Sequence, residues 1–148
     1  MASQAPKALK LFIPGDPVAQ GRPRAARRGE HIVVYTAQKD STWRGECRTV
    51  ASAAMNGNSP WVGPVKITLH FYFSRPQAHF GKRGLRPSAP ILPTKARQDY
   101  DNLAKAVTDG LQSLVFADDR QIVHAEIFKH YAYDGQPPGV AIIVEALD

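Results

Sequence analysis

Alternating hydrophobic and polar positions predict a β-sheet in this chain. The clearest strand covers residues 66–73, in which every second residue from Ile67 to Phe73 is large and apolar. The residues between them, such as His70, fall on the opposite face. Strands are also expected at residues 9–13, 31–35, 121–133 and 140–147, and the periodicity leaves open whether any of them run parallel.

Apolar residues at three- and four-residue steps predict two helices. The first is expected at residues 36–55, where Trp43 and Cys47 share one face. The second is expected from Asn102 to about Val115. Its buried stripe consists of Leu103, Val107, Leu111 and Leu114.

The order of these elements indicates a single domain of the α/β (α+β) class over residues 1–148. We expect a mixed sheet of four to five strands with two main helices packed on it. Residues 15–28, rich in proline, glycine and arginine, are expected to form a surface loop. Residues 74–98 hold four prolines, six Lys or Arg residues and no acid, which predicts a long, flexible and structureless basic loop.

Basic residues outnumber acidic ones, giving a formal net charge of +6 and a pI near 9.7. An anionic partner is therefore expected, with nucleic acid before an anionic membrane. The basic residues flank an acidic centre, and a phosphodiester-cleaving enzyme needs this arrangement to hold the DNA backbone with arginines and a metal with carboxylates. The candidates for DNA contact are Arg22, Arg24, Arg27, Arg28, Lys82, Arg83, Arg86, Lys95 and Arg97.

Other functional classes find little support in the sequence. Its single cysteine, Cys47, excludes an internal disulfide and a zinc site built from several cysteines. No apolar run approaches the roughly 18 to 20 residues of a membrane span, and the N-terminus lacks a signal-peptide pattern. No glycine pattern of a nucleotide-binding loop is present. We expect a cytoplasmic protein without a membrane partner or a nucleotide cofactor.

Two aspartates precede the second helix. Asp101 stands at the expected N-cap, where its carboxylate would satisfy free backbone donors. This role leaves Asp99 unexplained. If the Asp99–Asp101 segment is extended, both carboxylates lie on one side of the backbone. Lys105 lies four residues after Asp101, about 40° around the helix, and could reach the same place or form an ordinary exposed ion pair.

A second acidic pair, Asp118 and Asp119, follows the same helix. Acids at a helix C-terminus oppose the helix dipole, so stability does not favour them there, although Asp118 alone could be a turn residue. If Asp119 folds back near Asp99 and Asp101, the clustered charges must protonate, disperse or bind a cation. Oxygen ligands suit Mg²⁺, with Mn²⁺ as a substitute, and such an ion can activate water against a phosphodiester.

The segment Asp99-Tyr100-Asp101-Asn102-Leu103-Ala104-Lys105, followed by Asp118-Asp119-Arg120-Gln121, resembles the RusA family of Holliday-junction resolvases. The family signature is D-x-D-N-L-x-K, a helix and then D-D-x-Q, and the likeness extends from about Leu9 to Leu147. It implies a homodimeric, Mg²⁺-dependent endonuclease that makes paired nicks in four-way DNA junctions. Matched residue by residue, the metal-binding aspartates are Asp99, Asp101 and Asp119, and the catalytic residues are these three with Lys105.

Two alternatives remain open at this point. The metal chemistry does not encode the shape of the substrate, so a broader nuclease of branched or flapped DNA is one of them. The other is a basic DNA-binding protein that is not an enzyme and whose acids hold a structural cation or cap a helix. The basic loop at residues 74–98 is longer than in the shortest family members, which affects the expected substrate contacts more than the chemistry.

Overall fold

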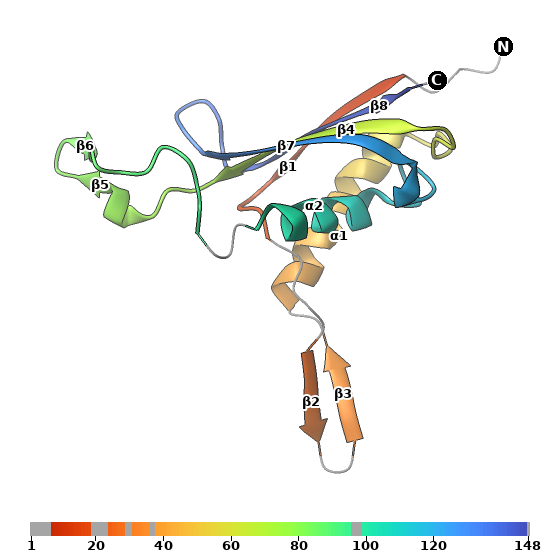
Figure 1. The fold of residues 1–148 in the computed structure, drawn as a ribbon, viewed down its shortest axis with the longest axis horizontal. Helices are drawn as coiled ribbons and strands as arrows, with labels where there is room; N and C mark the ends of the chain where they lie inside the picture. The colour runs from red at the N-terminus through yellow and green to blue at the C-terminus, as the bar shows by residue number, and fades with distance from the viewer. Residues whose placement is uncertain (1–6, 19–23, 29–30, 36–37, 96–98, 148) are drawn as a thin grey trace.

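A mixed four-stranded sheet forms the body of the protein (Figure 1). The computed structural model describes residues 7–18, 24–28, 31–35, 38–95 and 99–147. The strand order is β1-β8-β4-β7, and only the β4–β7 pair is parallel. These strands are β1 (Ala8–Pro14), β4 (Val65–Phe73), β7 (Ile122–Tyr131) and β8 (Gly139–Ala146).

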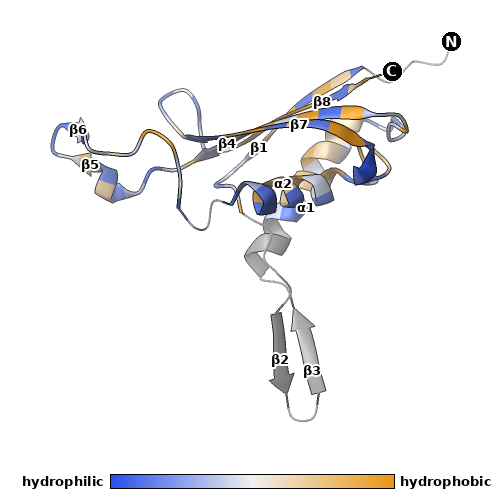
Figure 2. Ribbon diagram, in the orientation of Figure 1, coloured by the Kyte–Doolittle hydropathy of each residue, from blue (hydrophilic) through white to orange (hydrophobic). Residues whose placement is uncertain are grey.

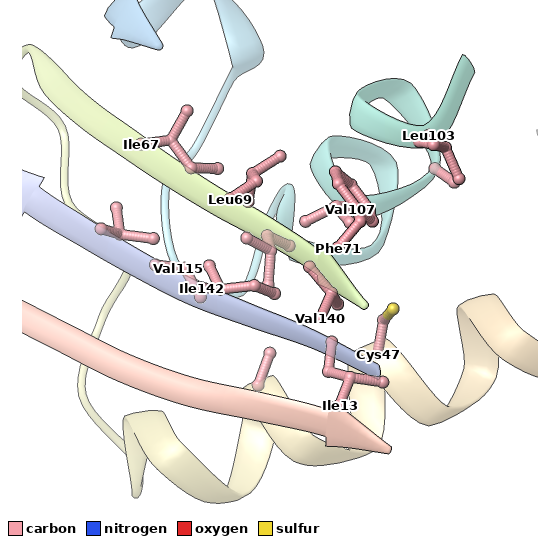
Figure 3. Close-up of a cluster of buried hydrophobic side chains, with 14 of the residues drawn as sticks. Ile13, Cys47, Ile67, Leu69, Phe71, Leu103, Val107, Val115, Val140 and Ile142 are labelled. Carbon is pink, nitrogen blue, oxygen red and sulfur yellow. The ribbon is translucent and has the colours of Figure 1, made fainter. Parts of the chain in front are cut away.

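Two helices, α1 (Gln38–Met55) and α2 (Tyr100–Leu111), lie on the same side of this sheet (Figure 1). Burial alternates residue by residue along β4, as the sequence predicts, and Figure 2 shows hydrophobic and hydrophilic colours alternating along the main strands. The inward side chains of β4 meet Leu103 and Val107 of α2 and Cys47 of α1 in one core (Figure 3). The predicted fold class is confirmed.

Helix α2 connects β4 to β7 and allows these two strands to run parallel, since a parallel pair needs a long crossover. It packs closely on α1 at Gly110, where an added Cβ would lie 2.8 Å from the Cβ of Cys47. Arg48 of α1 donates from Nη1 to the carbonyl oxygens of Gly110 at 3.5 Å and Gln112 at 3.2 Å. The cationic side chain of one helix thus binds the carbonyl end of the other.

The C-terminal boundary of α2 differs from the predicted one. The helix ends at Leu111, because Gln112 has extended backbone angles and Ser113 has a positive φ of 73°. The chain then pairs with the segment before β4: Trp61 N–H donates to Val115 O at 2.9 Å, and Ala117 N–H donates to Trp61 O at 3.2 Å. Leu103, Val107 and Leu111 of the predicted stripe are buried in the helix, whereas Leu114 lies beyond it and is only partly buried against the core.

The expected surface loop at residues 15–28 is wrong in part. Residues Arg24–Arg28 form β2, which pairs antiparallel with β3 (His31–Tyr35) in a hairpin that projects away from the body in Figure 1. β3 is rich in β-branched residues, which favour strands. By pairing with β3, the arginine-rich segment becomes a strand, although its composition alone indicates a loop.

The prediction that residues 74–98 form a structureless loop is also wrong for the part of this segment that the structure describes. This segment contains a short helix η1 (Gln77–His79) and a small hairpin of β5 (Phe80–Gly81) and β6 (Gly84–Leu85). Gly84 has a φ of +99°, which favours glycine in the tight turn. Arg75 lies over the ring of Tyr131, 4.4 Å from its centroid, and donates to Pro90 O at 2.7 Å, so it ties the segment to the sheet.

Candidate active site

The two aspartates of the first motif lie at the exposed N-terminus of α2. The N-cap is Asp99 rather than Asp101, because the helix begins at Tyr100, and no side-chain hydrogen bond caps it. Asp101 therefore belongs to the first turn, and the expected extended Asp99–Asp101 segment is not formed. Acidic side chains at this end of a helix are favoured by its dipole.

Asn102 holds the two carboxylates together. Its side-chain Nδ2 donates to Asp99 Oδ2 at 3.4 Å, and its backbone N–H donates to Asp101 Oδ1 at 2.9 Å. The asparagine of the D-x-D-N motif thus contacts both acids. The sequence identified it only as a member of the motif, without a role.

Lys105 lies one helical turn after Asp101 and is exposed. Positions four apart on a helix face the same side, so its ammonium can reach a group bound near Asp101. In the described part of the chain Lys105 forms no ion pair, and the ordinary ion-pair interpretation therefore gains no support.

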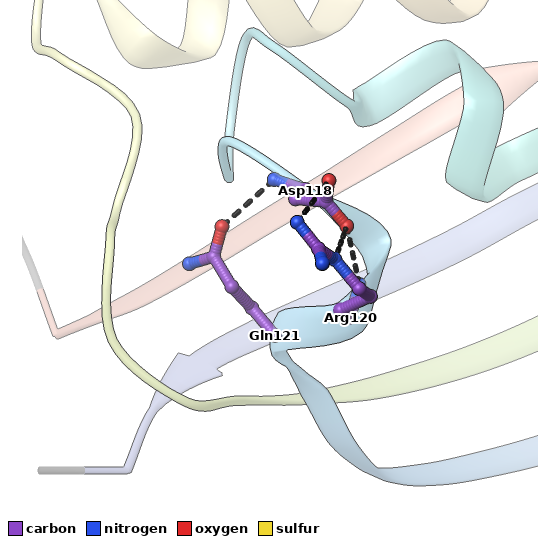
Figure 4. Close-up of polar contacts among 3 residues, drawn as sticks. All are labelled: Asp118, Arg120 and Gln121. Atoms are coloured by element: carbon purple, nitrogen blue, oxygen red, sulfur yellow. Dashed lines mark hydrogen bonds and ion pairs between the residues drawn. The ribbon is translucent and has the colours of Figure 1, made fainter.

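The second acidic pair begins a short helix, η3 (Asp119–Gln121), shown in Figure 4. Asp118 is its N-cap and accepts from the backbone N–H of Arg120 at 2.9 Å and from Arg120 Nε at 3.1 Å. These bonds lower the pKa of the Asp118 carboxyl, the backbone bond most. The turn-residue interpretation of Asp118 is confirmed, whereas Asp119 is exposed and does not act as the cap.

Gln121 fixes η3 to the segment before β4. Its Oε1 accepts from Asp118 N–H at 2.8 Å, and its Nε2 donates to Trp61 O at 2.8 Å and Gly63 O at 2.9 Å. Gln121 therefore positions Asp119 relative to the sheet. Its sequence signal was the capping-box spacing, an Asp followed three residues later by a Gln, which sequence reasoning did not use.

One predicted juxtaposition is not formed within the chain. No three His, Cys, Asp or Glu side chains of the described residues lie close enough to hold a metal ion together. Asp99 precedes α2 and Asp119 follows it, and a helix of 12 residues is about 18 Å long. The N-terminus of α2 thus offers two carboxylates, a donor set that suits Mg²⁺, but Asp119 of the same chain does not complete it.

The predicted DNA-contact residues lie mainly on the two projecting hairpins. Arg24, Arg27 and Arg28 belong to β2, and Lys82 and Arg83 form the exposed turn between β5 and β6. Arg86 and Lys95 are also exposed, whereas Arg22 and Arg97 lie outside the described residues.

Exposed carboxylates at a helix N-terminus, accompanied by arginine- and lysine-bearing hairpins, are the arrangement expected of an enzyme that acts on nucleic acid. The chain belongs to the family described as Endodeoxyribonuclease RusA, whose pattern matches residues 14–145. It is also similar to the uncharacterized protein YqaN of Bacillus subtilis strain 168, with 28% identity over 138 residues that cover 92% of this chain and 94% of YqaN. The resemblance found in the motifs is confirmed, and membership of this family supports DNA endonuclease activity.

None of the described helices is both long and apolar enough to cross a bilayer.

Proposed function

We propose that this protein is a Mg²⁺-dependent endonuclease that resolves four-way DNA junctions by paired symmetric nicks, in recombination, repair or phage DNA processing. The observation that carries the proposal is the pair of exposed carboxylates, Asp99 and Asp101, that Asn102 gathers at the N-terminus of α2. Family membership supplies the DNA endonuclease class. The basic hairpins supply the phosphate contacts.

Each residue of the motif has a distinct task in this proposal. Asp99 and Asp101 would hold the Mg²⁺, for which Mn²⁺ could substitute, and Asn102 keeps their oxygens oriented. Lys105 binds the phosphate under attack and offsets its growing negative charge. When bound, the metal ion supplies an activated water and stabilises the leaving oxygen.

The active form is proposed to be a homodimer in which Asp119 of one chain approaches Asp99 and Asp101 of the other. The length of α2 separates these acids within a chain, and a two-fold dimer brings different surfaces of two copies together. Two symmetric nicks also require two active sites. The dimer would thus supply both the third carboxylate of each site and the two sites that paired cleavage requires.

Mixing two inactive variants tests this arrangement. Asp101→Asn and Asp119→Asn should each be inactive alone, but an exchanged mixture should regain nicking. One site of each mixed dimer would have all its acids, and the other site would have lost two. Sites that lie within one chain would gain nothing from mixing, so a mixture as inactive as its components would contradict the shared site.

Cleavage of a synthetic four-way junction tests the function itself. We expect Mg²⁺-dependent nicks at symmetric positions, lowered by about 100-fold or more in Asp101→Asn, since even groups that only support metal ligands cost about 10- to 100-fold. Glu46→Gln, which removes an exposed carboxylate on α1, should cleave normally. Normal cleavage by Asp101→Asn would refute the catalytic assignment. Equal rates on linear duplex would refute junction specificity, and faster cleavage of a flap would favour the broader branched-DNA nuclease.

A further inference from the structure

The sheet face away from the helices carries a cluster of rings. β4 places His70 and Tyr72 on this face, and its parallel partner β7 places Phe128 and His130 directly opposite them. Tyr133, just beyond β7, contacts Tyr72 edge-on with ring centroids 6.5 Å apart. We call these five residues the aromatic track.

The four rings on the strands form parallel layers. His70 and Phe128 stack with centroids 4.5 Å apart and an angle of 6° between planes, and Tyr72 and His130 stack at 4.9 Å and 22°. His70 Nδ1 and His130 Nε2 are 3.0 Å apart and share a hydrogen bond across the strands. The rings are therefore held in fixed orientations by one another, and stacked arrangements of this kind are favourable for aromatic groups.

The stack ends at an open edge of the sheet. β7 is the last strand in the order β1-β8-β4-β7, and none of the described strands pairs with its outer edge (Figure 1). Phe128 has His70 on one side and is 42% exposed, and Tyr133 is 67% exposed. A flat aromatic ligand can add to such a stack as its next layer.

The track leads into a groove beside the basic hairpin. This groove, of about 530 Å³, lies between the β5–β6 segment and the turn after β7. Tyr133 belongs to both the track and the groove, and Phe80 and Leu85 of the hairpin form an apolar wall opposite.

Charge indicates what kind of ligand fits. The hairpin segment contains no acid from Phe71 to Gln98, and its turn exposes Lys82 and Arg83. On the sheet face the nearby Glu126 is already 3.4 Å from Lys66 Nζ, and the groove contains a single acid, Asp134. The surface therefore combines exposed rings with a positive border, which suits a ligand that is aromatic and anionic at once.

We propose that the aromatic track binds unpaired nucleobases of the DNA substrate, with their phosphates on the basic β5–β6 hairpin. Bases stack on Phe128 and Tyr133, and the strand continues through the groove. Such stacking tolerates any sequence, since every base has a π-face. The inference rests on the proposed function, because a branch point is where an endonuclease meets bases outside a duplex.

Two oligonucleotides with identical backbones separate base stacking from charge. Fluorescence anisotropy would measure binding of the full-length protein to a labelled oligothymidylate and to an abasic strand of the same length, without Mg²⁺ so that no cleavage occurs. Wild type should prefer the strand with bases. Phe128→Ala and Tyr133→Ala should each weaken binding of the oligothymidylate by about 5- to 150-fold and leave binding of the abasic strand unchanged.

Val123→Ala is the matched control, since Val123 is apolar, 65% exposed and on the same strand but outside the track. It should bind like wild type. Equal affinity of wild type for the two strands would overturn the proposal. So would a Phe128→Ala variant that keeps the preference for bases but no longer dimerises in sedimentation, because the face would then be an interface between copies.

Junction cleavage distinguishes this inference from the proposed function. If wild type cleaves junctions with Mg²⁺ but shows no preference for bases, only the inference fails. If it prefers bases but cleaves nothing, the proposed nuclease function fails and the binding site stands. Asp101→Asn should retain the preference, because the track does not include the N-terminus of α2.

Discussion

Gly110 controls how closely α2 can approach α1, and Gly110→Ala tests this contact. The added Cβ would lie 2.8 Å from Cys47 Cβ and 3.6 Å from its Sγ. Non-bonded carbons prefer about 3.5 to 4.0 Å, and a Cβ cannot rotate away because it is fixed to the backbone. The helices must therefore move apart by close to an ångström.

The size of the effect follows from two opposing contributions. Overpacking a core costs about 1 to 3 kcal/mol, and replacing a helical glycine by alanine returns about 0.5 to 1 kcal/mol. We expect Gly110→Ala to lower the free energy of unfolding by about 0 to 2.5 kcal/mol, measured by urea denaturation followed by circular dichroism.

Gly45→Ala is the matched control for this substitution. Gly45 is an exposed residue of α1, and beyond its own stretch of helix backbone an added Cβ there would meet no atom within 4 Å. It should be more stable than wild type by about 0.5 to 1 kcal/mol, since only the helix contribution remains. If the two alanine variants were equally stabilised, the close contact between the helices would be refuted. If Asp101 and Lys105 act as proposed, Gly110→Ala should also slow junction cleavage, because α2 carries both residues.

Two further measurements concern η3 and the histidine pair. Gln121→Ala should lower the free energy of unfolding by about 1 to 3 kcal/mol in urea denaturation, because two backbone carbonyls before β4 lose their donor. Arg120→Ala should change it little, because the side chain of Arg120 is 88% exposed. Equal losses in the two variants would contradict the role of Gln121. Burial, and then the nearby His70, lower the pKa of His130 below its ordinary value of 6.5. Near pH 6.5 the unfolded chain therefore binds more protons than the folded one, and the folded state should lose stability as the pH falls below 6.5. His130→Gln should flatten this decline in thermal unfolding between about pH 7 and pH 5, and an unchanged slope would refute the assignment.

The sequence by itself determined the faces of the main strands and helices. Alternation over residues 66–73 gives the two faces of β4 directly, since neighbouring side chains of a strand must point to opposite sides. The acids before α2 and the Asp118–Gln121 pattern are equally local, because each depends on spacings of a few residues. For this reason a motif could identify the family before any fold was known.

Only the tertiary structure decided which distant segments meet. The hairpin within residues 74–95 is tied to the sheet by Arg75 on Tyr131, a contact between segments far apart in sequence. The parallel pairing of β4 with β7 stacks the rings of the aromatic track.

The same limit applies to the acids of the candidate active site. The family resemblance implied that Asp119 joins Asp99 and Asp101 in one metal site, whereas α2 separates the segments that carry them within the chain. Periodicity carries information about a residue and its near neighbours. Contacts between distant segments depend instead on how the whole set of elements packs, and no local pattern encodes that arrangement.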